Sequence, residues 1–176
     1  MVGIDTSATL ITELRTSCEV LPVHGVIAGI VDLTRHAPAD CTTVTCMGDT
    51  LTHLPDAGSV RSMLRDAHFV LAPGGRFVAT WRPLDAPLQG VARFTPVRSD
   101  ADRVFTCFLE WGDGHVLVHD LVHERDKAGA WAFHASVYPK LIVPEARLVD
   151  WAAEAGFVDV AVRAAGRLSA LTAVKP

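Results

Sequence analysis

Leu-Ala-Pro-Gly-Gly-Arg-Phe-Val, at residues 71–78, is the stretch that decides the fold class of this sequence. It follows a segment, 59–69, whose apolar residues recur at helical spacing. The Pro-Gly-Gly turn at 73–75 breaks that pattern, because proline lacks an amide donor and glycine adopts turn conformations. The apolar residues of 76–81 then predict a strand. A helix followed by a turn and a buried strand is typical of chains that alternate helices and strands around a parallel sheet.

The residues before this stretch repeat the same alternation. Short apolar or β-branched runs predict strands at 2–4, 23–30 and 42–47. A helix is predicted after the first of these strands, with Asp5, Thr6 or Ser7 available as its N-cap. The N-terminal half therefore favours a parallel α/β core.

The pattern changes after Pro83. Two β-rich runs, 103–111 and 115–125, are joined by Gly112-Asp113-Gly114, which predicts a hairpin. A third antiparallel strand is predicted at 131–141, a helix at 144–155, and closing strands at 157–162 and 168–174. We therefore predict one α/β domain with a parallel core at 1–83, an antiparallel β insertion at 84–141, and a C-terminal helix and closing strands at 142–176.

Composition excludes several classes of protein. The chain has 20 acidic and 16 basic residues and a net charge of −4, which argues against a nucleic-acid partner. No apolar run approaches the roughly eighteen residues that cross a bilayer, and the N-terminus lacks the basic region of a secretory signal. The four cysteines form no CxxC pair, so we expect reduced thiols, no metal site and a cytoplasmic location. Homo-oligomers are compatible with this composition.

Acidic residues follow the predicted strands at the positions where ligands bind in α/β proteins. Asp5, Asp32 and Asp49 each come directly or shortly after a strand. Ligands of open parallel sheets lie beyond the carboxyl ends of the strands, and a carboxylate can accept both hydroxyls of a ribose. For Asp5, capping of the following helix is the alternative interpretation.

Four segments, in this order, resemble class I S-adenosylmethionine-dependent methyltransferases. They are Gly-Ile-Asp-Thr-Ser (3–7), Cys-Met-Gly-Asp-Thr-Leu-Thr-His-Leu (46–54), Leu-Ala-Pro-Gly-Gly-Arg-Phe-Val (71–78) and Glu-Ala-Gly-Phe (154–157). The resemblance extends from residue 1 to about residue 174, and the hairpin resembles the insertion of members similar to glycine N-methyltransferase. It implies a Rossmann-like methyltransferase sheet, S-adenosylmethionine as cofactor, and methyl transfer to a small-molecule acceptor.

The resemblance also implies a set of cofactor-binding residues, namely Asp5, Thr6, Ser7, Asp32, Cys46, Met47 and Gly48. Asp5 is expected to hold the ribose hydroxyls, with Thr6 and Ser7 beside the adenosine. Asp32 is the nearest candidate for the acid at the adenine amino group, although Ile30 occupies the place expected for that acid. Residues 46–48 are expected to line the methionine end.

His53 and Asp49 are the candidate catalytic residues, because they follow this segment near the expected position of the acceptor. A histidine there suits a general base, and a packing histidine is the alternative. Asp49 either orients the acceptor or caps the following helix.

Aromatic and basic residues near the strand ends are further candidates. Trp81 and Tyr138 are candidates for the wall of a sulfonium pocket, with core packing as the alternative. Arg82, Arg93 and Arg98 are candidates for binding an anionic acceptor, with solvated surface as the alternative.

One departure from the family pattern affects the functional prediction. The family's glycine-rich GxGxG turn ends the first strand, and the ribose-binding acid here is already residue 5. We therefore expect a truncated chain that lacks the first βα unit, with a gap between strands 2–4 and 42–47 that is closed or empty. A partner that fills the gap is the alternative. Methyl transfer is then expected to be impaired.

Two other functions are kept as alternatives. The first is a non-catalytic methyltransferase-like remnant or partner-binding module, which the missing glycine turn favours. The second is a nicotinamide-dependent Rossmann oxidoreductase, which shares the acid at the strand end and lacks the Pro-Gly-Gly turn.

Overall fold

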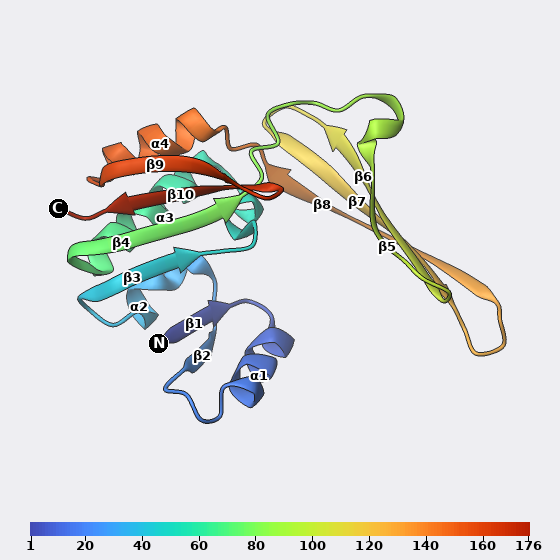
Figure 1. The fold of residues 1–176 in the computed structure, drawn as a ribbon, viewed down its shortest axis with the longest axis horizontal. Helices are drawn as coiled ribbons and strands as arrows, with labels where there is room; N and C mark the ends of the chain where they lie inside the picture. The colour runs from blue at the N-terminus through green and yellow to red at the C-terminus, as the bar shows by residue number, and fades with distance from the viewer.

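The computed structural model describes all residues 1–176 and places them in an α/β core and an antiparallel sheet that extends from it (Figure 1). The helices are α1 (Ala8–Ser17), α2 (Leu33–His36), α3 (Ala57–Val70) and α4 (Glu145–Glu154), with short 3-10 helices η1 (Ile30–Asp32), η2 (Thr50–His53) and η3 (Gly90–Arg93). The strands are β1 (Val2–Asp5), β2 (His24–Ile27), β3 (Cys41–Cys46), β4 (Leu71–Trp81), β5 (Phe94–Ser99), β6 (Arg103–Trp111), β7 (His115–Arg125), β8 (Trp131–Leu141), β9 (Val158–Ala165) and β10 (Leu168–Val174). The predicted α/β class with an antiparallel sheet is confirmed.

The core contains two separate groups of strands. β1 pairs with β2 in parallel, and the second group has the order β3-β4-β10-β9. In this second group β3 is parallel to β4, and β10 is antiparallel to both of its neighbours. β1 lies next to β3 in space (Figure 1), but no hydrogen-bonded ladder joins them and no other strand lies between them. No strand of this chain therefore joins the two groups.

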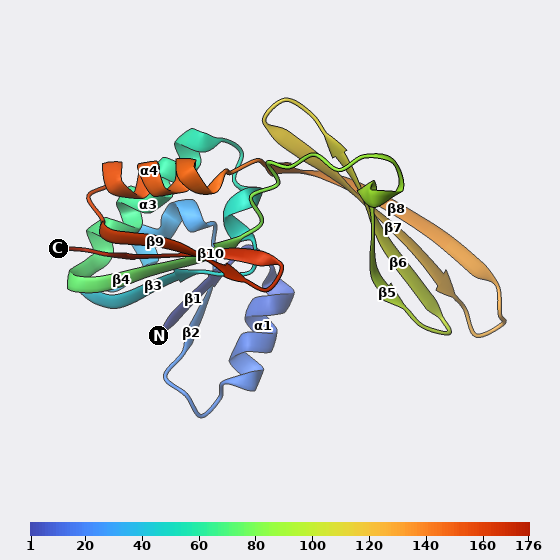
Figure 2. The ribbon, with the colours of Figure 1, turned by 45° about the horizontal axis from the view of Figure 1, so that its top comes forward.

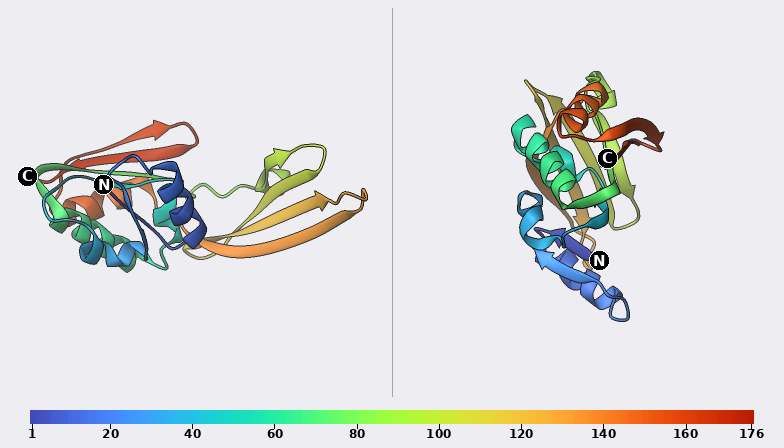
Figure 3. Two further views of the ribbon diagram at one scale, coloured as in Figure 1. Left: turned by 90° about the horizontal axis from the view of Figure 1, so that it is seen from below. Right: turned by 90° about the vertical axis from the view of Figure 1, so that its left-hand side faces the viewer.

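Helices cover the two faces of the core unequally. A Cβ at Gly3 of β1 would lie 2.8 Å from the side chain of Leu14 in α1, whereas the next residue, Ile4, packs against the main hydrophobic cluster. Successive side chains of a strand point to opposite faces, so α1 lies on the face opposite that cluster. α2, α3 and α4 gather on the cluster side (Figure 3).

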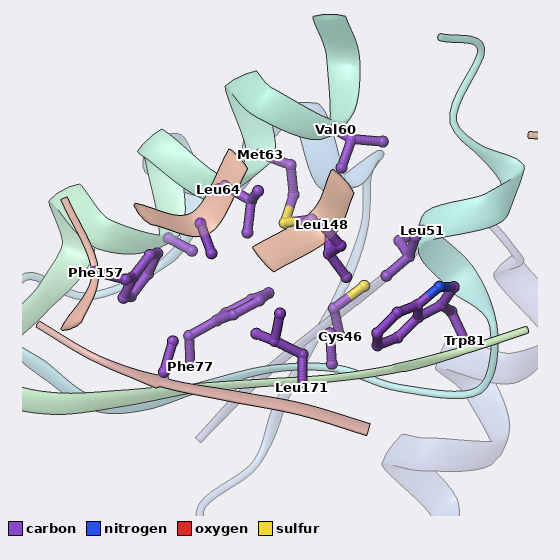
Figure 4. Packing of buried hydrophobic residues seen from close by; sticks show 14 of the residues in the cluster. Cys46, Leu51, Val60, Met63, Leu64, Phe77, Trp81, Leu148, Phe157 and Leu171 are labelled. Atoms are coloured by element: carbon purple, nitrogen blue, oxygen red, sulfur yellow. The ribbon is translucent and has the colours of Figure 1, made fainter. Parts of the chain in front are cut away.

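The hydrophobic cluster fixes these helices on the sheet. Figure 4 shows Phe77 and Trp81 of β4 and Leu171 of β10 packed beneath Met63 of α3 and Leu148 of α4. All five side chains are at most 1% exposed. Their burial from strand and helix together supplies the main apolar contribution to the stability of the core.

The antiparallel sheet has the order β5-β6-β7-β8 and projects away from the core (Figure 2). The predicted β6–β7 hairpin is confirmed, and β7 pairs with β8 along its whole length. The two chain segments that cross between core and sheet are bonded to each other. Val143 N–H donates to Pro83 O (3.1 Å), and the indole N–H of Trp81 donates to Val143 O (2.9 Å).

The Pro-Gly-Gly segment forms a bulge within β4, whereas a turn before a new strand was predicted there. Gly74 has a φ of 76° and donates its N–H to Lys175 O (2.8 Å), and Lys175 N–H donates to Gly75 O (2.9 Å). The pairing of β3 with β4 shifts register at this point. The helical pattern ends before this segment as predicted, but the strand begins at Leu71 and not at residue 76. The C-terminal residues supply hydrogen-bond partners that the local sequence does not reveal.

Two other boundaries differ from prediction. The strand predicted at 23–30 ends at Ile27, and Ile30 begins η1 and packs against the core cluster. An apolar run is equally suited to a buried strand and to a buried turn of helix, so composition did not separate them. β5 was not predicted, because Pro96 argues against an interior strand; it lies at the edge of the antiparallel sheet, where proline is tolerated.

The bulge at Gly75 generates a stability prediction. A Cβ added there would lie 2.7 Å from Ala72 O and 3.0 Å from Cys41 O, both of them backbone atoms. We expect Gly75→Ala to lower the free energy of unfolding by about 1–3 kcal/mol, because backbone must shift to admit the methyl group. Gly112→Ala is the matched control, since its nearest contact is His115 O at 3.6 Å. Denaturant titration of both variants checks this, and equal stabilities would contradict the account of the bulge.

Candidate functional site

The carboxyl ends of the parallel strands lie together at one edge of the core. β1, β3 and β4 point the same way in Figure 1, so Asp5 at the end of β1 lies at the same edge as Met47 and Arg82, which follow β3 and β4. This is the edge at which open α/β sheets bind ligands.

Asp5 combines a structural role with a free acceptor. Its Oδ1 accepts the N–H of Ser7 (2.7 Å), and the Ser7 hydroxyl in turn accepts the N–H of Leu10 (3.3 Å) as the N-cap of α1. No protein group donates to Asp5 Oδ2. The turn therefore holds the carboxylate in place and leaves one oxygen for a ligand. The N-cap of α1 is Ser7, so the capping interpretation of Asp5 was wrong. Thr6 beside it is exposed.

A tight turn carries the chain away from β3. Gly48 and Asp49 are consecutive residues in the left-handed region, with φ of 72° and 76°. Thr80 of β4 fixes both: its hydroxyl accepts Gly48 N–H (2.9 Å), and its carbonyl accepts Asp49 N–H (3.1 Å). A Cβ at Gly48 would meet no atom within 4 Å, so the backbone here is open to a ligand. Met47 is 51% exposed beside it.

Asp49 joins three parts of the molecule through a buried carboxylate. It is only 5% exposed, and its Oδ1 accepts the backbone N–H of Arg82 (2.9 Å) and the hydroxyl of Thr52 (3.1 Å). Its Oδ2 accepts a hydrogen bond from the ammonium of Lys140 in β8. The carboxylate caps no backbone N–H of η2, so the capping interpretation of Asp49 was wrong.

His53 lies against the antiparallel sheet at the end of η2. Its ring stacks on Tyr138 of β8 with centroids 5.5 Å apart. Partial burial lowers the pKa of His53, and the nearby Lys140 charge lowers it further, while Asp49 opposes the shift. The imidazole is therefore mainly neutral near pH 7 and able to accept a proton.

A cavity of about 310 Å³ separates the end of β4 from the antiparallel sheet. Arg82, Lys140 and Arg167 line it together with Asp120 and Tyr138. Lys140 is compensated by Asp49, so the two arginines face one remaining carboxylate. The cavity thus favours a polar ligand that carries negative charge.

Cys107 also lines this cavity and does not suit nucleophilic chemistry. Burial and a hydrogen bond to Asp120 (3.2 Å) raise the pKa of its thiol to about 11. The thiol therefore stays protonated, whereas the thiolate is the nucleophilic form.

None of the predicted catalytic and cofactor-binding residues lines the cavity, although Asp49 and His53 contact Lys140 and Tyr138, which do. Asp32 is in η1 and pairs with the exposed Arg35 (3.3 Å). The side chain of Cys46 points into the core (Figure 4), where burial raises the pKa of its thiol to about 11. Only the backbone of Cys46 is available to a ligand at this edge of the sheet.

Among the aromatic and basic candidates, Tyr138 and Arg82 line the cavity. Trp81 is a fully buried core residue, as its alternative interpretation stated. Arg93 lies over the Phe108 ring (4.3 Å), and Arg98 pairs with Asp100 (2.7 Å). Sequence reasoning missed Lys140, Asp120 and Arg167, which no local motif marks.

Solved structures share this fold, although no protein-family model matches the sequence and no curated protein matches it significantly. The CcbJ methyltransferase from Streptomyces caelestis superposes with a TM-score of 0.78 at 19% identity, over 99% of this chain and 74% of that one. The sugar N-methyltransferase KedS8 from Streptoalloteichus superposes with a TM-score of 0.78 at 16% identity, over 99% of this chain and 70% of that one. The amino pentose methyltransferase CalS10 from Micromonospora echinaspora was solved with S-adenosylmethionine bound. It superposes with a TM-score of 0.77 at 17% identity, over 99% of this chain and 73% of that one.

This chain has the fold of class I S-adenosylmethionine-dependent methyltransferases. The methyltransferase fold accounts for the parallel core, the antiparallel partner strands β9 and β10, and the projecting sheet as parts of one arrangement. The structure contains no helix that is long and apolar enough to cross a membrane.

The buried pair of Asp49 and Lys140 generates a prediction about stability. Asp49→Ala leaves the Lys140 ammonium, whose side chain is 13% exposed, without a counter-charge. We expect the free energy of unfolding to fall by about 3–5 kcal/mol. Asp49→Ala combined with Lys140→Met should recover part of this loss, because the unpaired charge is then absent.

Glu154→Ala is the control for this experiment. It breaks the Arg61–Glu154 pair, whose side chains are 49% and 53% exposed, and should change stability by about 0–1 kcal/mol. Urea denaturation of the four chains gives the comparison. A loss for Asp49→Ala as small as that of the control would show that Asp49 does not hold core and sheet together.

Proposed function

We propose that this chain serves S-adenosylmethionine-dependent methyl transfer to a small-molecule acceptor. The observation that carries the proposal is the free carboxylate oxygen of Asp5 at the same strand edge as the open Gly48 backbone. The neighbouring cavity of about 310 Å³ suits an acceptor of small-molecule size. Relatives in fold include a sugar and an amino pentose methyltransferase, which supports a small polar acceptor here.

The residues present fit part of this cofactor. Asp5 Oδ2 is placed to accept a ribose hydroxyl, and Met47 and Gly48 offer an exposed surface to the methionine end. Asp32, partly exposed after β2, remains the candidate for the adenine end. No glycine-rich turn of GxGxG type is present in the sequence. We therefore propose that this chain alone binds the cofactor weakly and transfers methyl groups poorly.

The chain's own groups would align the acceptor and accept its proton. When bound, S-adenosylmethionine supplies an electrophilic methyl group on a sulfonium. His53 is held by stacking on Tyr138 and is neutral, so it can take a proton from an acceptor hydroxyl or amine. Asp49 positions Lys140 and the Arg82 backbone at the cavity and does not reach the acceptor itself.

The charges of the cavity indicate the chemistry of the acceptor. Arg82 and Arg167 lack ion-pair partners, whereas Asp120 accepts a hydrogen bond from the Cys107 thiol. We propose an acceptor with an anionic group directed at the arginines. A cytoplasmic location and homo-oligomers stay predictions of the sequence alone.

A non-catalytic, partner-binding role is the second candidate function. It is favoured by the free facing edges of β1 and β3, which a folded enzyme core would normally pair.

Cofactor binding tests the first proposal directly. We expect calorimetry of residues 1–176 with S-adenosylmethionine to give a Kd weaker than about 0.1 mM. Asp5→Asn keeps an oxygen for Ser7 N–H and replaces the free acceptor by a donor, so affinity should fall by about tenfold or more. Asp113→Ala, an exposed acid in the β6–β7 turn, is the control and should bind like the parent chain. Equal affinities for all three chains would refute the ribose role of Asp5.

The pH dependence of methyl transfer tests His53. Because its pKa lies below the ordinary value of 6.5, the rate should rise with pH through that lowered pKa and level off above it. His53→Ala should remove this acidic limb and lower the plateau by about 100-fold. Release of S-adenosylhomocysteine, measured across a panel of small hydroxyl and amine acceptors, gives the rate.

His123→Ala is the matched control, since this exposed histidine of β7 also contacts an aromatic ring, that of Phe133. This variant should keep both the rise of the rate with pH and the rate on the plateau above it. If the rate of His53→Ala still rose with pH in the same way, the proton transfer would belong to another group.

A further inference from the structure

The cavity between the end of β4 and the antiparallel sheet has two chemically different sides. On the core side, Arg82 follows β4, and Arg167 lies in the turn between β9 and β10. Trp81 pairs with Ser169 across the β4–β10 ladder, so the register brings the two arginines to the same end of the core. A carboxylate can accept hydrogen bonds from two such guanidinium groups at once.

The sheet side of the cavity carries an apolar wall, which Phe105, Leu109 and Val118 form. Leu109 pairs with Val118 across β6 and β7, and Val118 pairs with Tyr138 across β7 and β8. Because alternate residues of a strand share a face, Phe105 of β6 points to the same side as this row. Phe105 and Leu109 are only half-buried, so a ligand with an apolar surface would complete their burial.

The charged side chains on the sheet side are already engaged within the chain. Lys140 pairs with Asp49, and Asp120 accepts a hydrogen bond from the Cys107 thiol. The sheet therefore offers a ligand few free hydrogen-bonding groups. A ligand with many hydroxyl groups would leave most of them without a partner on this side, which costs free energy.

Charge and volume limit the kind of acid that fits the cavity. Lys140 is compensated by Asp49, and Asp120 offsets the charge of one of the two arginines, so one positive charge remains. A carboxylate carries the single negative charge that balances it. The cavity volume of about 310 Å³ is about ten times that of a water molecule in the liquid, which suits one substituted ring.

We propose that the acceptor is a small carboxylic acid with an apolar, ring-sized body. Its carboxylate binds Arg82 and Arg167, and its ring packs against the apolar wall. The hydroxyl or amine to be methylated is directed at Tyr138, which lines the cavity and stacks on His53. This inference rests on the proposed methyl transfer and narrows its acceptor from a small anion to an amphipathic acid.

Three ligands of similar size separate the two recognition elements on the unaltered chain. 4-Hydroxyphenylacetate has the carboxylate, the ring and a hydroxyl group, whereas gluconate keeps the carboxylate and replaces the ring by a hydroxylated chain. 4-Hydroxyphenylethanol keeps the ring and has no charge. We expect calorimetry without S-adenosylmethionine to show that 4-hydroxyphenylacetate binds about tenfold or more tighter than either of the other two.

Two substitutions assign the recognition to individual side chains. Arg167→Gln should weaken the binding of 4-hydroxyphenylacetate by about tenfold and leave that of 4-hydroxyphenylethanol unchanged. Arg163→Gln, at an exposed arginine of β9 outside the cavity, is its control and should bind like the parent chain. Phe105→Gln should weaken both ring ligands, and Phe133→Gln, at a phenylalanine of β8 that is 57% exposed, is its control.

Three results would overturn the proposal. They are gluconate or 4-hydroxyphenylethanol binding as tightly as 4-hydroxyphenylacetate, equal losses in Arg167→Gln and Arg163→Gln, and no binding of 4-hydroxyphenylacetate at millimolar concentration. The three ligands are compared on the unaltered chain, so the proposal stays open to refutation even if Phe105→Gln does not fold.

Titration with S-adenosylmethionine separates this inference from the proposed function. A chain that fails to bind the cofactor and still prefers 4-hydroxyphenylacetate would refute methyl transfer and support the acid site. A chain that binds the cofactor without this preference would refute the acid site alone.

Discussion

The carboxylate of Asp49 is the interaction on which the arrangement of core and projecting sheet depends. One residue receives hydrogen bonds from the end of β4, from η2 and from β8. Its left-handed backbone is fixed by Thr80, so its position follows from the β3–β4 ladder. The cavity, the stacking of His53 on Tyr138 and the orientation of Lys140 all lie around this one buried acid. Removing its charge therefore affects structure and candidate chemistry together.

Local periodicity predicted much of the fold. The β6–β7 hairpin, the strand of residues 131–141 and the helix that begins after Pro144 lie where alternation and turn residues place them. The bulge at Gly74 and Gly75 was not predictable, because its partner, Lys175, lies about a hundred residues away in sequence. Edge strand β5 was missed because Pro96 and Arg98 interrupt its apolar pattern.

The candidate site was predictable only where it follows strand ends. Asp5, Gly48 and His53 were found because their neighbours resemble a known order of motifs. Lys140 was not found, since 91 residues separate it from Asp49 and a lysine in a strand gives no local signal. Asp49 contacts β4, η2 and β8, and Asp5 both forms a turn and keeps a free acceptor oxygen. These roles depend on three-dimensional contacts that the spacing of residues in the sequence does not show.

The two crossings between core and antiparallel sheet have a mechanical consequence. Pro83 and Val143 are bonded to each other, and the indole of Trp81 anchors both to the buried core. The Asp49–Lys140 pair and the stacking of His53 on Tyr138 lie at the same base of the sheet. A substitution at this base would therefore change the position of β5–β8 relative to the core, whereas one at the far turns would not.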